Sequence, residues 1–191
     1  MNDSRTSLRR RLIDQRLSLS GDVQAVAALA IIEPTMAAVS LASSRRVAAY
    51  LSHRGEIDLS PTLTLLIEHG FEVVLPVCRP ESSLDFCPWH PGDDLAEGPF
   101  GIGEPRTPPV DITSIGAVLV PGVGFSADGS RIGHGAGYYD RFFARCFAVD
   151  HDPVRVGVAH DLQVVDLPPP ESWDVAMHQI ITPAKVFHVS T

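Results

Sequence analysis

Hydrophobic positions recur every three or four residues in several stretches of this chain, and each such stretch predicts an amphipathic helix. Ser4 can cap the first of these helices, and Ser60 is the expected N-cap of another, with Pro61 in its first helical position. Pro34 is expected to interrupt or kink a further helix, because proline removes a backbone donor. The predicted helices cover residues 5–19, 22–43, 61–70 and 138–148.

Apolar runs without helical spacing lie between these helices and predict strands that are buried on both faces. They cover residues 46–52, 71–77, 84–89, 115–120, 154–159 and 179–182. Because strands alternate with helices, we expect an α/β fold, a three-layer sandwich with a mostly parallel central sheet and helices on both faces. Residues 90–109, rich in proline and glycine, are expected to form a long surface loop. The length favours a single domain over residues 1–191.

Composition narrows the choice of partners. The net charge of −8 argues against general nucleic-acid binding, which needs a basic surface. No apolar run approaches the length of a membrane span, so no membrane partner is expected. The three cysteines form no CxxC pair, and we expect free thiols in a reducing compartment. The N-terminus lacks the apolar core of a secretory signal. We therefore expect a cytoplasmic protein. Small-molecule partners and a monomer or weak homodimer are further expectations that composition alone does not establish.

The most informative segment covers residues 120–141, with the sequence VPGVGFSADGSRIGHGAGYYDR. Six of the chain's 15 glycines lie between positions 122 and 137. Glycine is favoured where the backbone needs a positive φ or a close approach, so this enrichment needs a local cause. The segment follows a predicted strand and precedes a predicted helix, which is how proteins present backbone N–H groups to a phosphate. It is neither a Walker loop, since GK[ST] is absent, nor the dinucleotide pattern GxGxxG. A glycine-rich turn that only connects strand to helix is the alternative.

Charged residues add further candidate chemistry around this glycine loop. Arg131 offers a planar charged fork for phosphate oxygens. Arg5 and Arg9 share a face of the first predicted helix and could bring positive charge into an acidic chain, or could simply be solvated. Asp140 could bind a Mg²⁺ ion that bridges phosphates, or could complement the N-terminus of its own helix.

Other polar residues give weaker signals. Glu56 follows a predicted strand, at the edge where ligands bind in parallel sheets, and could accept hydrogen bonds from a ligand ring. Asp174 is a second candidate metal ligand without a local motif, and His134 is the histidine inside the glycine loop. The sequence contains no HxxxH, HExxH or zinc-type Cys/His spacing and no GxSxG elbow, which argues against a zinc site and an α/β-hydrolase.

Residues 121–141 resemble the signature of the 5-formyltetrahydrofolate cyclo-ligase family, also called methenyltetrahydrofolate synthetase, which reads PG-x-x-F-x-x-x-G-x-R-x-G-x-G-x-GYYD. The supporting similarities are RTSLR at residues 5–9, LSHRGE at 51–56, GIGEP at 101–105 and DVAMHQIIT at 174–182, so the resemblance spans nearly the whole chain. It implies the ATP- and Mg²⁺-dependent cyclisation of 5-formyltetrahydrofolate to 5,10-methenyltetrahydrofolate, with release of ADP and phosphate.

The resemblance also implies a role for each matching position. Arg131, Tyr138 and Tyr139 are implied as catalytic residues, and Asp140 and Asp174 as metal ligands. The implied folate contacts are Leu51, Glu56, His134 and Tyr138. The implied ATP contacts are Arg5, Arg9, Arg131, Ile132, Gly133, His134, Gly135, Ala136, Gly137, Tyr138 and Tyr139.

The chain departs from the family pattern at four positions. Arg5 stands for the usual lysine, Ala136 for glycine or lysine, His178 for aspartate and Pro183 for glutamate. These departures keep a non-catalytic or repurposed nucleotide- or folate-binding homologue as an alternative. A different enzyme on a similar sheet, such as a phosphosugar isomerase or a CoA-dependent transferase, is a second alternative.

Overall fold

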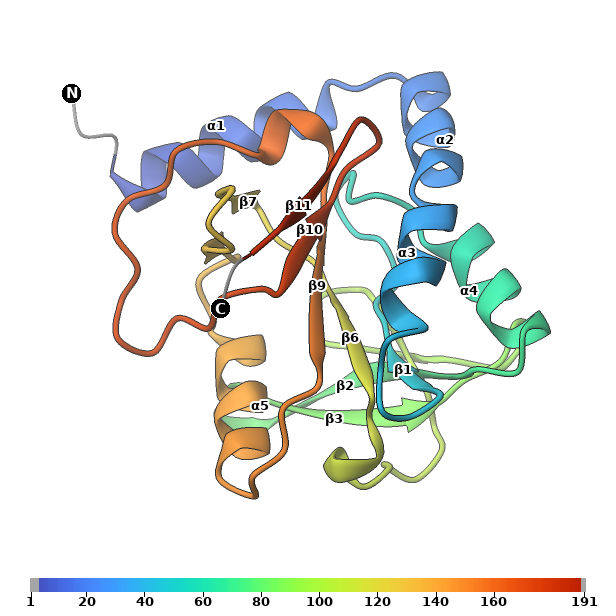
Figure 1. The fold of residues 1–191 in the computed structure, drawn as a ribbon. Helices are drawn as coiled ribbons and strands as arrows, with labels where there is room; N and C mark the ends of the chain where they lie inside the picture. The colour runs from blue at the N-terminus through green and yellow to red at the C-terminus, as the bar shows by residue number, and fades with distance from the viewer. Residues whose placement is uncertain (1–3, 190–191) are drawn as a thin grey trace.

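A computed structural model of the protein describes residues 4–189 and is built around a seven-stranded sheet (Figure 1). Its strands are β1 (Arg46–Ala48), β2 (Glu72–Arg79), β3 (Ser83–Pro88), β6 (Ala117–Val120), β9 (Val154–Val158), β10 (Gln179–Ile181) and β11 (Val186–His188). Their order is β11-β10-β9-β6-β1-β2-β3. Neighbours from β10 to β2 pair in parallel, whereas β11 and β3 join the two edges antiparallel.

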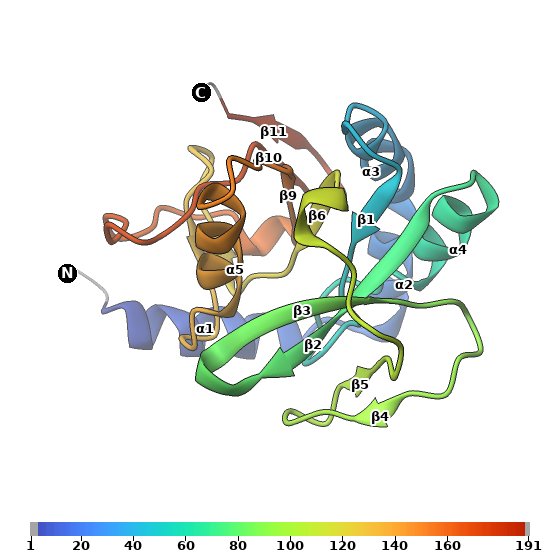
Figure 2. The ribbon, with the colours of Figure 1, turned by 90° about the horizontal axis from the view of Figure 1, so that it is seen from below.

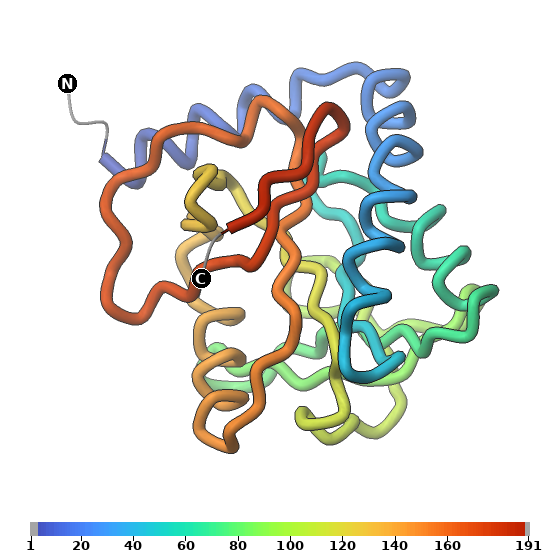
Figure 3. Tube along the Cα trace, viewed as in Figure 1, coloured from blue at the N-terminus to red at the C-terminus, as the bar shows by residue number. Residues whose placement is uncertain are grey.

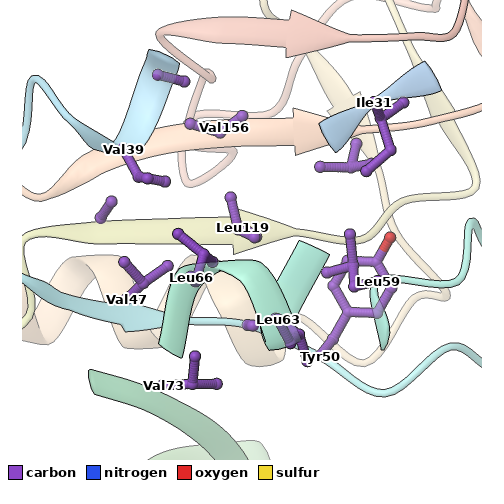
Figure 4. Packing of buried hydrophobic residues seen from close by; sticks show 14 of the residues in the cluster. Ile31, Val39, Val47, Tyr50, Leu59, Leu63, Leu66, Val73, Leu119 and Val156 are labelled. Atoms are coloured by element: carbon purple, nitrogen blue, oxygen red, sulfur yellow. The ribbon is translucent and has the colours of Figure 1, made fainter. Parts of the chain in front are cut away.

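Helices cover both faces of this sheet, as predicted (Figure 2). On one face lie α2 (Gly21–Ala30), α3 (Ile32–Val39) and α4 (Ser60–Glu68), and on the other lies α5 (Tyr138–Phe147). Successive residues of a strand point to opposite faces, so Val73 packs under α4 while Val74 packs with Phe142 of α5. Val73 belongs to the cluster of buried residues on the α4 side of the sheet. Figure 4 shows this core cluster, in which Leu63 and Leu66 of α4 face the sheet.

The first helix, α1 (Arg5–Leu17), lies across the end of the sheet where β6 finishes (Figure 1). Ser4 caps it, because the Ser4 side chain accepts a hydrogen bond from the Ser7 amide. Leu8 and Leu12 of α1 pack with Val123 and Ile132 of the glycine loop. The carboxyl edge of the sheet is therefore enclosed between α1 and the glycine loop.

A long segment, residues 164–178, returns along this same edge (Figure 3). It follows the short helix η3 (Asp161–Gln163), passes the start of α1 and reaches the start of α5 before entering β10. Arg5 Nη2 donates to Pro169 O at 2.8 Å, and the Val175 amide donates to Asp140 Oδ1 at 3.3 Å. These contacts join the segment to both helices.

Several helix and strand boundaries differ from the prediction. The helix expected over residues 22–43 is two helices that break at Ile31, and Pro34 lies in the first turn of α3, where its missing N–H costs little. Ser60 is not an N-cap but the first residue of α4, and its amide donates to Asp58 Oδ1 at 3.0 Å. The strand expected over residues 46–52 ends at Ala48.

Segments predicted as loops contain short strands. The region 90–109 holds a hairpin of β4 (Ala96–Glu97) and β5 (Gly103–Glu104), and the glycine loop holds β7 (Gly124–Phe125) paired with β8 (Arg131–Ile132). Elements of two residues leave no periodic signal in a sequence. Cys78, Cys87 and Cys146 are free, as predicted.

The prediction that no apolar run approaches the length of a membrane span is wrong for one segment. The segment Gly21–Val39 is 19 residues long and contains an 18-residue window with a mean hydropathy of 1.4, so it meets the length and composition of a span. A third of that window is buried, and Ile31 and Val39 pack in the core cluster of Figure 4. The segment is the α2–α3 pair that covers one face of the sheet.

Candidate active site

A cavity of about 900 Å³ lies at the carboxyl edge of the sheet, between α1, the glycine loop and the β4–β5 hairpin. Its volume is near the upper end for small-molecule sites, which span about 300–1,000 Å³. Every residue that the sequence suggested for ATP, folate or a metal lines it: Arg5, Arg9, Leu51, Glu56, Arg131, Ile132, Gly133, His134, Gly135, Ala136, Gly137, Tyr138, Tyr139, Asp140 and Asp174. The fold thus brings together positions that are up to 169 residues apart.

The two arginines of α1 are held against the cavity wall by different partners. Arg9 Nε donates to Gly133 O at 2.9 Å, which fixes the guanidinium beside the glycine loop. Arg5 Nη2 lies 2.9 Å from Asp174 Oδ2 and also reaches Pro169 O. Burial of Leu8 and Leu12 orients the helix so that both guanidinium groups face the cavity. Both side chains are therefore held on the cavity wall by protein partners, and their role in binding phosphates stays a prediction.

The glycine loop adopts a conformation that needs its glycines at two positions. Gly135 has a φ of 106° and Gly137 a φ of 70°, a left-handed region in which a Cβ is strained. Gly137 is the N-cap of α5, so the loop ends directly at a helix N-terminus. A loop that merely connected strand to helix would not need such a sequence of turns.

The backbone amides of residues 133 to 137 have no acceptor within residues 4–189. Three carbonyl groups of this stretch do have partners, because Gly133 O accepts from Arg9, Ala136 O accepts from the Arg141 side chain and Gly137 O accepts from the Arg141 amide. The N–H groups in the first turn of α5 also have no intrahelical partner, as in any helix. Consecutive unpaired amides at a helix N-terminus form a concave site for an anion.

Two ion pairs hold the predicted metal ligands. Arg131 Nη2 lies 2.9 Å from Asp140 Oδ2, and Arg5 Nη2 lies 2.9 Å from Asp174 Oδ2. The Arg131 side chain is 6% exposed, so its charge is compensated mainly by Asp140. Asp140 is therefore more than a complement to the dipole of α5. The Val175 amide, next to Asp174, donates to Asp140, so the two carboxylates come from segments in direct contact.

Glu56 lies at the other end of the cavity and is almost buried. Its Oε2 accepts from the His53 amide at 3.1 Å, and its Oε1 lies 3.4 Å from His134 Nε2 and 3.9 Å from Arg16 Nη1. Burial lowers the pKa of the Arg16 guanidinium, while the charge of Glu56 opposes that shift. The glycine loop thus brings His134 to Glu56, and α1 places Arg16 beside the same carboxylate.

Tyr138 and Tyr139 begin α5 and face the cavity. Burial raises the pKa of the Tyr139 phenol, with Glu56 as a further cause, and burial also raises that of Tyr138. Both phenols therefore stay protonated at neutral pH and can donate hydrogen bonds. The Arg131 guanidinium lies over the Tyr139 ring, 5.6 Å from its centre.

Sequence reasoning missed several residues of the site. Arg16 is fully buried behind Glu56, and its spacing of four from Leu12 places it on the buried face of α1, which could have indicated it. Phe100 and Glu104 line the cavity from the unpredicted hairpin, and Phe100 packs edge-on against Tyr138 at 6.0 Å. Trp173 lines it from the segment 164–178. His178 and Pro183, two of the departures from the family pattern, are absent from the described cavity lining.

This fold and site define an α/β protein with a ligand-sized cavity at the carboxyl edge of its sheet, lined by arginines, carboxylates and a glycine loop. The 5-formyltetrahydrofolate cyclo-ligase family matches residues 1–183. The 5-formyltetrahydrofolate cyclo-ligase of Escherichia coli (strain K12) is 36% identical over 146 residues, which cover 74% of this chain and 79% of that protein. The enzyme of Saccharomyces cerevisiae is 33% identical over 196 residues, covering 91% of this chain and 92% of that one.

Two solved structures of methenyltetrahydrofolate synthetases are similar to this fold. The NMR structure of Aquifex aeolicus 5,10-methenyltetrahydrofolate synthetase superposes with a TM-score of 0.83 at 28% identity, covering 98% of this chain and 93% of that one. The Mycoplasma pneumoniae synthetase, at 21% identity, shares the fold with a TM-score of 0.77 over 94% of this chain and 99% of its own.

The chain belongs to the 5-formyltetrahydrofolate cyclo-ligase family. Membership confirms the predicted resemblance, the α/β fold and the enzyme class, an ATP-dependent ligase of folate metabolism. The roles of individual residues stay predictions.

Proposed function

We propose that this protein cyclises 5-formyltetrahydrofolate in the cavity described above, and that the amides of residues 133 to 137 hold the ATP phosphates. The unpaired state of these N–H groups carries the proposal, because they stand beside Arg9 and Arg131 at a helix N-terminus. An anion with several oxygens can accept from amides and guanidinium groups at the same time.

The reaction proceeds in two steps. The formyl oxygen attacks the γ-phosphorus of ATP, the bond from that phosphorus to the ADP oxygen breaks, and ADP leaves. N10 then attacks the activated formyl carbon and loses its proton, and phosphate departs with the former formyl oxygen. The product is the 5,10-methenyl ring, and no oxidant or reductant is consumed.

The basic residues act on the charge that moves during the first step. Arg9 is held beside Gly133 and Arg131 belongs to the glycine loop itself, and both line the cavity, so their guanidinium groups can follow negative charge on the transferring phosphoryl group. Alignment matters equally, since two bound molecules must meet with their reacting atoms in line. The loop conformation fixed by Gly135 and Gly137 supplies that alignment.

The other end of the cavity suits the folate. The Glu56 carboxylate can accept from the ring N–H and amino groups of a pterin, and Leu51 offers an apolar contact beside it. His134 extends from the glycine loop to within 3.4 Å of Glu56 and can contact both substrates. The protonated phenols of Tyr138 and Tyr139 can donate to bound oxygens. Exclusion of water, a competing nucleophile, protects the activated intermediate, and apolar side chains that include Phe100 line part of the cavity.

Asp140 and Asp174 fit a Mg²⁺ ion that is shared with phosphates. Within residues 4–189 no cluster of three or more His, Cys, Asp or Glu residues could hold a metal alone. Mg²⁺ is typically bound by one or two carboxylates together with substrate phosphates and water, and these two carboxylates lie on adjoining segments of the cavity wall. When bound there, the ion would neutralise phosphate charge.

A non-catalytic relative is the competing proposal, motivated by Arg5, Ala136, His178 and Pro183. The structure gives it little support, because Arg5 keeps its charge on the cavity wall. His178 is absent from the described cavity lining, and its Nδ1 accepts a hydrogen bond from the Arg155 amide at 3.0 Å. The free cysteines are compatible with the proposed cytoplasmic location.

A turnover assay tests the proposal. The protein is mixed with Mg-ATP and 5-formyltetrahydrofolate, and the methenyl chromophore and ADP are followed together. We expect equimolar formation of both, and loss of both in Arg131→Gln. Binding of both substrates without product would favour the non-catalytic relative, and stabilisation by sugar phosphates alone would favour a different enzyme.

A further inference from the structure

Trp173 is an exposed indole on the wall of the active-site cavity. Its side chain is 67% exposed, although tryptophan normally buries most of its large apolar surface. Within residues 4–189 the Trp173 ring makes no aromatic or cation–π contact. The ring therefore presents a free face toward a space large enough for a ligand.

The backbone that carries this ring is held in place. The Glu171 amide donates to Asp174 Oδ2 at 2.8 Å, and the Asp174 amide donates to Glu171 O at 3.0 Å, which closes a turn around Trp173. Arg5 binds both Asp174 and Pro169, so the turn is anchored to α1 at two points. Because the backbone of this turn is already fixed, a ligand that binds to the ring orders little further backbone.

Trp173 and Glu56 lie at different ends of the cavity. Trp173 is next to Asp174, which pairs with Arg5 at the start of α1. Glu56 lies near Arg16, eleven residues and thus about 16 Å further along the same helix. With the phosphates on the glycine loop and the folate at Glu56, the base of the nucleotide is left with the end that holds Trp173.

We infer that Trp173 stacks on the purine ring of ATP and so selects the nucleotide by its base. This inference rests on the proposed function, which places the phosphates on residues 133–137. Stacking uses the face of the ring and not its edge, so it favours large purine rings over pyrimidines and separates ATP from GTP only weakly. Trp173 is thus a specificity-determining contact and takes no part in the transfer of the phosphoryl group.

Fluorescence provides a direct test, because the chain has two tryptophans and Trp89 packs against the core. In the Trp89→Phe variant, Trp173 is the only source of tryptophan fluorescence. We expect a non-hydrolysable ATP analogue with Mg²⁺ to quench Trp173 and to lower its acrylamide quenching constant several-fold, whereas tripolyphosphate with Mg²⁺ leaves that constant unchanged. Binding of the analogue by calorimetry with no protection of Trp173 overturns the inference and leaves the proposed function standing. Absence of binding by calorimetry overturns both.

Kinetics provides a second test that a merely structural role would not pass. Trp173→Ala should raise the KM for ATP and for GTP on the order of tenfold, while kcat, the KM for 5-formyltetrahydrofolate and the affinity for tripolyphosphate stay as in the parent. Trp173→Phe should restore most of the loss, because phenylalanine keeps a stacking face. Equal KM values for ATP in Trp173→Ala and the parent would overturn the inference.

Discussion

Arg131 and Asp140 close the glycine loop with an ion pair, Nη2 to Oδ2 at 2.9 Å, that joins β8 to the first turn of α5. The cation that we propose for the phosphates is thus paired with the carboxylate that we propose for Mg²⁺. Arg5 and Asp174 repeat the same arrangement at 2.9 Å. Binding of Mg-ATP can exchange these partners with no net change in the charge of the protein groups, so nucleotide and metal should bind synergistically.

Asp140→Asn tests this exchange. The amide leaves Arg131 without its carboxylate, so we expect tighter binding of ATP in EDTA than in the parent and loss of most of the gain from Mg²⁺. Turnover should fall at least 100-fold. Isothermal calorimetry with and without Mg²⁺ measures both affinities, and Asp22→Asn, at the exposed start of α2, is the control. If the change in EDTA is absent and only the melting temperature falls, Asp140 is only a structural partner of Arg131.

Arg9→Ala should raise the KM for ATP by one to two orders of magnitude, because a charge-assisted hydrogen bond contributes about 1.5–3 kcal/mol. The KM for 5-formyltetrahydrofolate should change much less. Arg10→Ala is the matched control, since Arg10 is the exposed neighbour on α1 and is not part of the described cavity lining. Steady-state kinetics of both variants decides, and an unchanged KM in Arg9→Ala would remove Arg9 from the phosphate site.

Gly135→Ala should weaken ATP binding beyond its effect on folding. A Cβ at a φ of 106° is strained, and we expect a loss of about 1–2 kcal/mol in the free energy of unfolding. Gly70→Ala is the control. Gly70 lies at the end of α4 with a φ of 77°, and a Cβ added there meets open space, so the substitution imposes similar backbone strain away from the cavity. Urea unfolding should show comparable losses, while calorimetry should show weaker ATP binding only in Gly135→Ala. Equal ATP affinity in the two variants would contradict a phosphate-binding loop.

Stability should decrease as pH falls below about 6.5, the ordinary pKa of histidine. Burial lowers the pKa of His160 in the folded protein, and burial followed by Arg155 lowers that of His178. The unfolded chain therefore binds protons first on acidification, so the free energy of unfolding falls from about pH 6.5 downward until the folded-state pKa values are reached. His160→Asn should flatten this slope in urea unfolding between pH 7 and 5. An identical slope in the variant would show that His160 does not contribute.

Much of the fold was predictable because its long elements have periodic hydrophobic patterns. The buried strand β6 and the amphipathic α5 lie where predicted, each within one or two residues. The break at Ile31 was misplaced at Pro34 because a proline in the first turn of a helix looks the same in sequence as a proline that ends one. The β4–β5 hairpin escaped prediction because two-residue strands depend on tertiary contacts and not on local pattern.

The site was predictable where glycine and charge coincide, as they do from Arg131 to Asp140. Contacts between distant segments were not: the pairing of Arg5 with Asp174 joins positions 169 residues apart and leaves no local signal. Arg16 shows a limit of another kind. Its spacing of four from Leu12 indicates the buried face of the helix, but its partner Glu56, 40 positions away in the sequence, is shown only by the fold.

A crystal structure with a non-hydrolysable ATP analogue, Mg²⁺ and 5-formyltetrahydrofolate measures the central claim most directly. We predict phosphate oxygens within hydrogen-bond distance of the amides of residues 133 to 137 and of Arg9, with the formyl oxygen in line with the γ-phosphorus. Phosphates bound elsewhere in the cavity, with those amides turned to solvent, would contradict it.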